Sequence, residues 1–233
     1  MNGLPVLLNH DGTPLIAFGS AGIIRQDPNN HDYVIKAPLK HDVKGCNDDV
    51  VKAVETEVLF SELCIEREKL IYQTLRKDPN ILDCIAITER GLHFPYMCLG
   101  NLRDCLQNHD QLAGLLRDRW ISNAVNAVAV VHSHEIVHAD ITTRNFLVAD
   151  DLSIKLCDFS GSAIRDLEPF VEEEDRYRMS PYSPRSFRTD IFALGCLIFE
   201  ISTGLRPYDE IDDRDYKEIE RLYAAQVFPL TDG

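Results

Sequence analysis

Two stretches near the middle of the chain decide the fold: His138-Ala-Asp-Ile-Thr-Thr-Arg-Asn145 and Leu156-Cys-Asp-Phe-Ser-Gly161. They place two carboxylates and one amide, those of Asp140, Asn145 and Asp158, close together in the sequence. Hard divalent ions such as Mg²⁺ prefer carboxylate and amide oxygens as ligands. The same region contains His132, His134 and His138, but their spacing matches no standard zinc signature.

The two stretches resemble the catalytic and metal-binding loops of eukaryotic protein kinases. Catalysis of phosphoryl transfer consists mostly of positioning and charge neutralisation. The resemblance implies that Asp140 orients the acceptor hydroxyl and accepts its proton, with Arg144 adding charge beside it. It implies that Asn145 and Asp158 bind magnesium, and that His138 packs between the two loops.

Upstream, Ala17-Phe-Gly-Ser-Ala-Gly-Ile-Ile24 is similar to the glycine-rich loop of the family, with Ala17 in place of the first glycine. Lys36, in Val34-Ile35-Lys36, resembles the strand lysine that contacts the nucleotide phosphates. A buried ammonium group needs an anionic partner to stay charged. We expect Glu68 to be that partner, with Glu66 and Glu62 as alternatives on the same helix.

The stretch Phe94-Pro95-Tyr96-Met97 resembles the hinge that receives adenine, although plain strand core would also explain it. The resemblance implies a nucleotide site for ATP with Mg²⁺ as cofactors. Its expected members are Ala17, Gly19, Gly22, Ile24, Val34, Lys36, Glu68, Phe94, Tyr96, Met97 and Leu147.

The predicted fold class is α+β, in two lobes. A small, mainly antiparallel sheet with one main helix is expected in residues 1–98, and a mainly helical lobe in 99–233. Helical spacing predicts helices over 48–75, lined by residues such as Leu59 and Leu63, and over 112–134, with Trp120 in the core. Residues 81–87 and 92–97 are predicted strands. The apolar run 191–201 predicts a helix buried on every face.

The composition limits the classes of molecule that the chain is expected to bind. A net charge of −14 opposes binding to nucleic acid or to an anionic membrane surface, and no stretch is long enough to span a bilayer. Seven scattered cysteines without a CxxC pair suit reduced thiols, so we expect a cytoplasmic protein, with the nucleus as an alternative. The expected partner is a protein substrate, and the oligomeric state stays open.

Three departures from the family pattern keep other functions open. Ala139 replaces the arginine that receives an activation-loop phosphate in many kinases, so we expect activity independent of phosphorylation. Ser160 replaces the glycine of Asp-Phe-Gly, and Ser183-Pro184-Arg185 stands near the place of Ala-Pro-Glu with its last charge reversed. The chain also ends at Gly233, where family domains normally continue with further helices.

The resemblance therefore predicts transfer of the γ-phosphoryl group of ATP to a protein hydroxyl. Serine or threonine is the default acceptor, although Thr142-Thr143-Arg144 leans toward the tyrosine-kinase arrangement. The alternatives are a pseudokinase scaffold that binds nucleotide or partners without catalysis, and a small-molecule phosphotransferase of similar fold.

Overall fold

The computed structural model describes residues 4–8, 12–108 and 110–230, and it divides into two compact units. The first unit holds residues 1–76 and 83–96, and the second holds residues 77–82 and 97–233. The assignment of functional lobes to 1–98 and 99–233 stays a prediction. Within the described residues, no helix combines the length and apolarity needed to cross a membrane.

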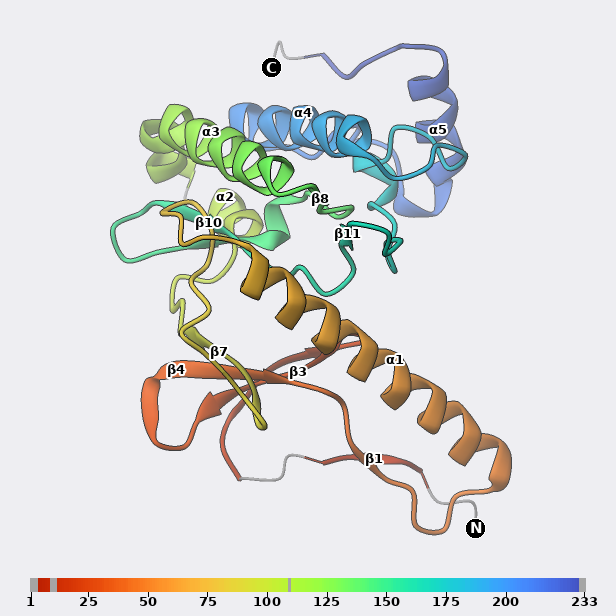
Figure 1. The fold of residues 1–233 in the computed structure, drawn as a ribbon. Coiled ribbons are helices and arrows are strands. Elements are labelled where there is room, and N and C mark those ends of the chain that lie inside the picture. Colours follow the sequence, from red (N-terminus) through yellow and green to blue (C-terminus); the bar gives the residue numbers. More distant parts are fainter. Residues whose placement is uncertain (1–3, 9–11, 109, 231–233) are drawn as a thin grey trace. The chain divides into compact units, whose positions relative to one another are not determined.

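The first unit is built on a five-stranded antiparallel sheet in the order β2-β3-β4-β7-β6 (Figure 1). Its strands are β2 (Leu15–Gly19), β3 (Gly22–Asp27), β4 (Asn30–Ala37), β6 (Ala86–Thr88) and β7 (Gly91–Pro95). The separate short pair is β1 (Val6–Leu7) with β5 (His41–Asp42). The predicted strand over 81–87 is wrong for most of its length. Only its end enters β6: residues 81 and 82 belong to the second unit, and residues 83–85 form no strand.

Helix α1 (Asp48–Thr74) is the one long helix of the first unit, seen in orange in Figure 1. Asn47 caps its first turn by accepting a hydrogen bond from the Val50 amide at 2.9 Å. The helix predicted over 48–75 is confirmed, but two of the leucines whose spacing predicted it, Leu59 and Leu63, are exposed. The buried face consists of Val54, Ser61, Cys64, Ile65, Arg67, Glu68 and Ile71.

The second unit is mainly helical, with α2 (Leu102–Asn108), α3 (Asp110–Ser133), α4 (Phe187–Thr203) and α5 (Tyr216–Ala224). Two short antiparallel strand pairs and three 3-10 turns lie in its loops. These are the pairs β8 (Ile136–Val137) with β11 (Ala163–Ile164) and β9 (Phe146–Val148) with β10 (Ile154–Leu156), and the 3-10 turns η1 (Thr143–Asn145), η2 (Asp175–Tyr177) and η3 (Asp213–Asp215). The α+β prediction is confirmed.

Helices α3 and α4 pack side by side and form the core of the second unit (Figure 1). Trp120 is fully buried on α3, as predicted, and its indole N–H donates to the Leu152 carbonyl at 2.9 Å. The prediction that α4 is buried on every face is wrong. Leu197 has no exposed surface, whereas Ile191 is 55% exposed, so α4 buries one face and leaves another open.

Candidate functional site

In the first unit, Lys36 and Glu68 form a buried ion pair. Strand β4 carries Lys36, α1 carries Glu68, and the Lys36 Nζ lies 2.6 Å from the Glu68 Oε2. Both side chains are almost completely buried, so each charge helps to stabilise the other. The alternatives are placed elsewhere: Glu66 is exposed and pairs with Lys69, and Glu62 is exposed.

The predicted glycine-rich segment forms the β2-β3 hairpin, in which Gly19 pairs with Gly22. Gly22 has a φ of +142°, and a Cβ built there would lie 2.5 Å from the carbonyl oxygen of Ala37 on β4. Only glycine allows this backbone conformation and this close approach between the strands. Ala17 and Gly19 are exposed on the outer strand of the hairpin.

The predicted adenine-side residues of the first unit follow the register of the sheet. Ile24 lies opposite Lys36, and Val34 lies opposite Phe94. Directly opposed residues of antiparallel strands point to the same face, and so do residues two apart on one strand. Ile24, Val34, Lys36 and Phe94 therefore share one face, whereas Tyr96 follows the end of β7 and is 40% exposed.

In the second unit, the catalytic-loop candidates Asp140 and Asn145 are joined directly. The Asn145 Nδ2 donates to the main-chain oxygen and to the Oδ2 of Asp140, each at 2.8 Å. Burial raises the pKa of Asp140 to about 7, although the Asn145 hydrogen bond opposes that shift. Because the amide nitrogen of Asn145 is used in this way, its oxygen is the atom suited to a cation.

Asp158 follows Cys157 on the adjacent loop, in a left-handed backbone conformation with a φ of 63°. The Ser160 hydroxyl donates to the Asp158 Oδ1 at 2.6 Å, so the serine that replaces glycine contacts the predicted metal ligand directly. The negative charge of Asp158 contributes to the raised pKa of Asp140, which places the two carboxylates in one electrostatic neighbourhood. An all-oxygen set of this kind fits Mg²⁺.

His138 joins the two loops, as predicted. Its Nε2 lies 3.1 Å from the Cys157 carbonyl oxygen, and its ring meets that of Phe159 edge-on at 5.0 Å between centroids. Its Nδ1 accepts a hydrogen bond from the Asp140 amide at 3.3 Å, which assigns the proton to Nε2. The His132 Nε2 lies 2.8 Å from the Asp190 Oδ2. His132 and His138 therefore both make structural contacts.

Asp190 on α4 holds the backbone of the catalytic loop through hydrogen bonds. Its carboxylate accepts the main-chain N–H of His138 at 2.8 Å and that of Ala139 at 2.9 Å, and it is completely buried. Ala139 has a φ of 65°, a conformation that a residue with a side chain rarely adopts. The carboxylate therefore stabilises a strained turn one residue before Asp140.

Sequence reasoning missed a polar cluster centred on Arg103 of α2. Its guanidinium contacts four groups on three distant segments: Thr143, Glu174, Tyr177 and Glu200. Burial raises the pKa of Glu200, which also accepts the Thr143 hydroxyl at 2.9 Å. The only sequence signal is an arginine among apolar residues at the start of a helix, which does not reveal its partners.

Arg185 was noted because its charge is reversed relative to the family pattern. In the structure its guanidinium pairs with the buried Glu173 at 2.9 Å and with Glu172 at 3.2 Å. The reversed charge is thus compensated within the same segment of the chain.

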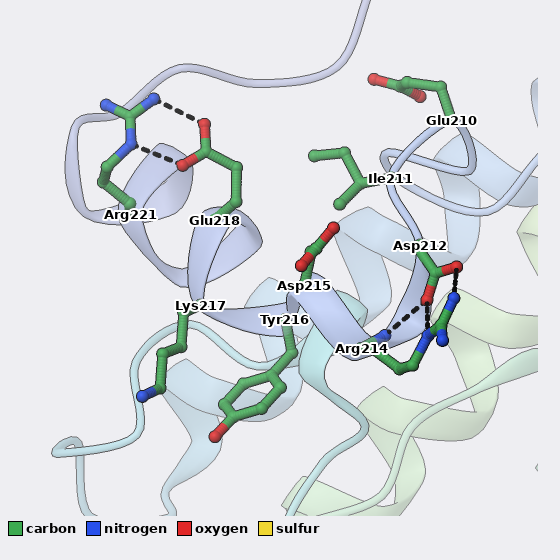
Figure 2. Close-up of a pocket in the computed structure, with 9 residues that line it drawn as sticks. All are labelled: Glu210, Ile211, Asp212, Arg214, Asp215, Tyr216, Lys217, Glu218 and Arg221. Atoms are coloured by element: carbon green, nitrogen blue, oxygen red, sulfur yellow. Dashed lines mark hydrogen bonds and ion pairs between the residues drawn. The ribbon is translucent and has the colours of Figure 1, made fainter.

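A separate open pocket of about 990 Å³ lies around η3 and the start of α5 (Figure 2). Four of its charged side chains pair along its wall: Arg221 with Glu218 at 2.7 Å, and Arg214 with Asp212 at 2.9 Å. The hydrogen bond of Arg214 lowers the pKa of Asp212 to about 2. None of the predicted site residues lines this pocket.

The predicted site is divided between the two units. Lys36 and the other sheet residues belong to the first unit, whereas Asp140, Arg144, Asn145, Leu147, Asp158 and Met97 belong to the second. Within each unit the structure brings the expected partners together. The roles of these residues toward a nucleotide stay predictions.

Comparison with known proteins covers nearly the whole chain. The family model described as "Protein kinase domain" matches residues 17–230. Similar curated proteins include the serine/threonine-protein kinase PDK1 of Cryptococcus neoformans (21% identity over 94% of this chain), the tyrosine-protein kinase Abl of Drosophila melanogaster (24% over 78%) and the Aurora kinase of Saccharomyces cerevisiae (30% over 54%). This chain spans 18%, 12% and 36% of their respective lengths. With its α+β architecture and a family match over residues 17–230, the chain belongs to the protein kinase family.

Proposed function

We propose that this chain is an active kinase that transfers the γ-phosphoryl group of ATP to a protein hydroxyl, with serine or threonine as the default acceptor. The observation that supports this most directly is the Asp140–Asn145 pair, joined by two hydrogen bonds of 2.8 Å and supported by Asp190. The relatives are named as serine/threonine or as tyrosine kinases, and the choice of serine or threonine rests on family frequency.

Each residue has a defined part in the proposed reaction. Asp140 orients the acceptor hydroxyl and takes its proton as the oxygen bonds to the γ-phosphorus. The bond between that phosphorus and the bridging oxygen then breaks, and ADP leaves. A pKa of about 7 suits a group that accepts a proton near neutral pH. Lys36, aligned by Glu68, neutralises phosphate charge.

Magnesium fits the oxygen ligands of the second unit. Asn145 and Asp158 would hold the ion, which when bound supplies positive charge to the phosphate oxygens. Asn145 fixes the carboxylate of Asp140 through the same amide group that offers its oxygen to the ion. Arg144 adds a positive charge next to Asn145 and is 57% exposed on its side chain.

A second candidate function is a pseudokinase scaffold. It is favoured by the 2.6 Å hydrogen bond from Ser160 to Asp158, which occupies a carboxylate oxygen that the active form offers to the metal. Such a protein would act through its contacts with other proteins.

We also propose a cytoplasmic or nuclear location, which the free thiols of all seven cysteines support.

Turnover of ATP with magnesium and a generic protein substrate separates these functions. The wild type should phosphorylate the substrate, and Asp140→Asn and Asp158→Asn should each abolish the activity. Activity that survives either substitution would come from a contaminant and would contradict the proposal. A thermal shift caused by ATP alone and by ATP with magnesium separates a nucleotide-binding scaffold from one that binds neither.

A further inference from the structure

Arg103 is a buried arginine, and each of its three guanidinium nitrogens donates a hydrogen bond. Its Nε donates to the Thr143 hydroxyl at 3.0 Å and lies 3.4 Å from the Glu200 Oε1, while its Nη2 donates to the Tyr177 hydroxyl at 3.1 Å. Its Nη1 donates to both oxygens of Glu174, at 3.3 and 3.2 Å. Arg103 thereby joins α2, the catalytic loop, α4 and the segment that contains Glu174.

Glu174 has a second cationic partner. Arg144, which directly precedes Asn145, also forms an ion pair with the Glu174 carboxylate. One partner, Arg103, is fixed in the interior, whereas the Arg144 side chain is 57% exposed. A carboxylate shared by a buried and an exposed guanidinium holds the exposed one in place, because charge-assisted hydrogen bonds are the strong ones.

The position of Arg144 matters because of its neighbours. It lies in the η1 turn between Thr143, which contacts both Arg103 and Glu200, and Asn145, which holds Asp140. Ala139 stands where many related enzymes have an arginine that binds a phosphate group. A segment that follows the metal loop is commonly ordered by a phosphate bound to arginines. In this chain the Glu174 carboxylate already forms ion pairs with two arginines, Arg103 and Arg144.

We propose that Glu174 is a positioning residue: it links Arg144 through Arg103 to α4 and so holds the catalytic loop with a fixed carboxylate, without phosphorylation. This inference rests on the proposed kinase function. It adds that the Glu174 carboxylate takes the ordering role of a bound phosphate and acts through Arg103 and Arg144.

The consequence of removing the charge follows from the contacts. In Glu174→Gln, Arg103 keeps Glu200, Thr143 and Tyr177, so the interior cluster retains an anion. Arg144 loses its ion pair and regains its rotamer freedom. The effect is therefore expected on the catalytic loop, and the nucleotide affinity should change little.

The matched control is Glu172→Gln, two residues earlier in the same segment. Glu172 is an exposed glutamate whose partners, Arg178 and Arg185, both lie outside the catalytic loop. It removes the same charge without touching Arg103 or Arg144.

The test measures steady-state kinetics with magnesium, ATP and a protein substrate, after phosphatase treatment of every variant. We expect the treated wild type to keep its turnover. Glu174→Gln should lower kcat about tenfold, which corresponds to about 1.4 kcal/mol in the barrier, and leave the KM for ATP within about twofold. Glu174→Asp should retain more activity than the Gln variant, and Glu172→Gln should keep the wild-type kcat.

Several results would overturn the inference: loss of turnover on phosphatase treatment, an unchanged kcat in Glu174→Gln, or an equal loss in Glu172→Gln. If the wild type has no turnover, the proposed kinase function fails, and hydrogen exchange tests the inference independently. Glu174→Gln should then speed amide exchange in residues 143–146 and 172–178 and leave α3 unchanged. Unchanged exchange in the first two segments would refute it.

Discussion

Replacing Asp190 by asparagine tests how the catalytic loop is held. The carboxylate accepts two main-chain N–H groups, from His138 and Ala139, and faces the His132 ring at 2.8 Å. An asparagine of the same shape offers one acceptor oxygen, and its NH2 group would point at a buried donor. The substitution therefore removes the charge and leaves one N–H of the turn unsatisfied.

The magnitude follows from these contacts. A hydrogen bond to a charged group contributes about 1.5–3 kcal/mol, and an unsatisfied buried donor costs about 1–3 kcal/mol. Ala139, with its φ of 65°, is strained and depends on the same carboxylate. We expect the free energy of unfolding to fall by about 3–5 kcal/mol, a large part of the about 5–15 kcal/mol that stabilises a typical domain.

The assay is urea unfolding followed by tryptophan fluorescence. The chain has a single tryptophan, Trp120, which is buried in the same unit as Asp190. The control is Asp215→Asn, because Asp215 is exposed on η3. A loss below about 0.5 kcal/mol in Asp190→Asn would refute the argument, since it lies within the usual range for surface substitutions. A similar loss in both variants would do so as well.

Three further predictions concern buried charges and the hairpin. Lys36→Met should abolish turnover and destabilise the protein by about 3–5 kcal/mol, because it removes the cation 2.6 Å from the buried Glu68 carboxylate. The double variant with Glu68→Leu should recover most of that stability in calorimetry without recovering activity. Gly22→Ala should lower the thermal midpoint, because its Cβ would lie 2.5 Å from a main-chain oxygen at a φ of +142°; an unchanged midpoint would show that the hairpin adjusts freely. Burial raises the pKa of Glu173. A carboxyl group whose pKa is higher in the folded state contributes stability that is fully present below its unfolded-state pKa and is lost as the pH rises through the folded value. The stability of the wild type relative to Glu173→Gln should therefore decrease from about pH 4 toward neutrality, where the unfolded-state pKa is about 4.3, and a constant difference in urea unfolding would contradict this.

Several predicted site residues contact one another in the structure because they lie within short stretches of the sequence. Asp140 and Asn145 are five residues apart in one loop, so their hydrogen bonds follow from local geometry. The prediction that His138 joins the two loops was confirmed on the same basis. Glu68 was preferred over Glu66 by its place in the helix, and burial separates the two in the structure.

The predictions failed where one helix offers apolar residues on more than one side. Helix α1 exposes Leu59 and Leu63 and buries Cys64, Ile65 and Glu68 instead. Periodicity shows that a helix is amphipathic, but the neighbouring elements select the side that is covered. For the same reason α4 is open at Ile191 although its sequence is apolar all round.

The sequence by itself determined the α+β class, the order of the site residues and the chemistry of their side chains. The tertiary structure alone decided which distant charges meet. Arg103 is 71 residues from Glu174 and 74 from Tyr177, and its bonds to them form only once α2 packs beside the catalytic loop. Hydrogen bonds and ion pairs act over a few ångströms, so such contacts depend on the packing of the whole unit and leave no periodic trace in the sequence.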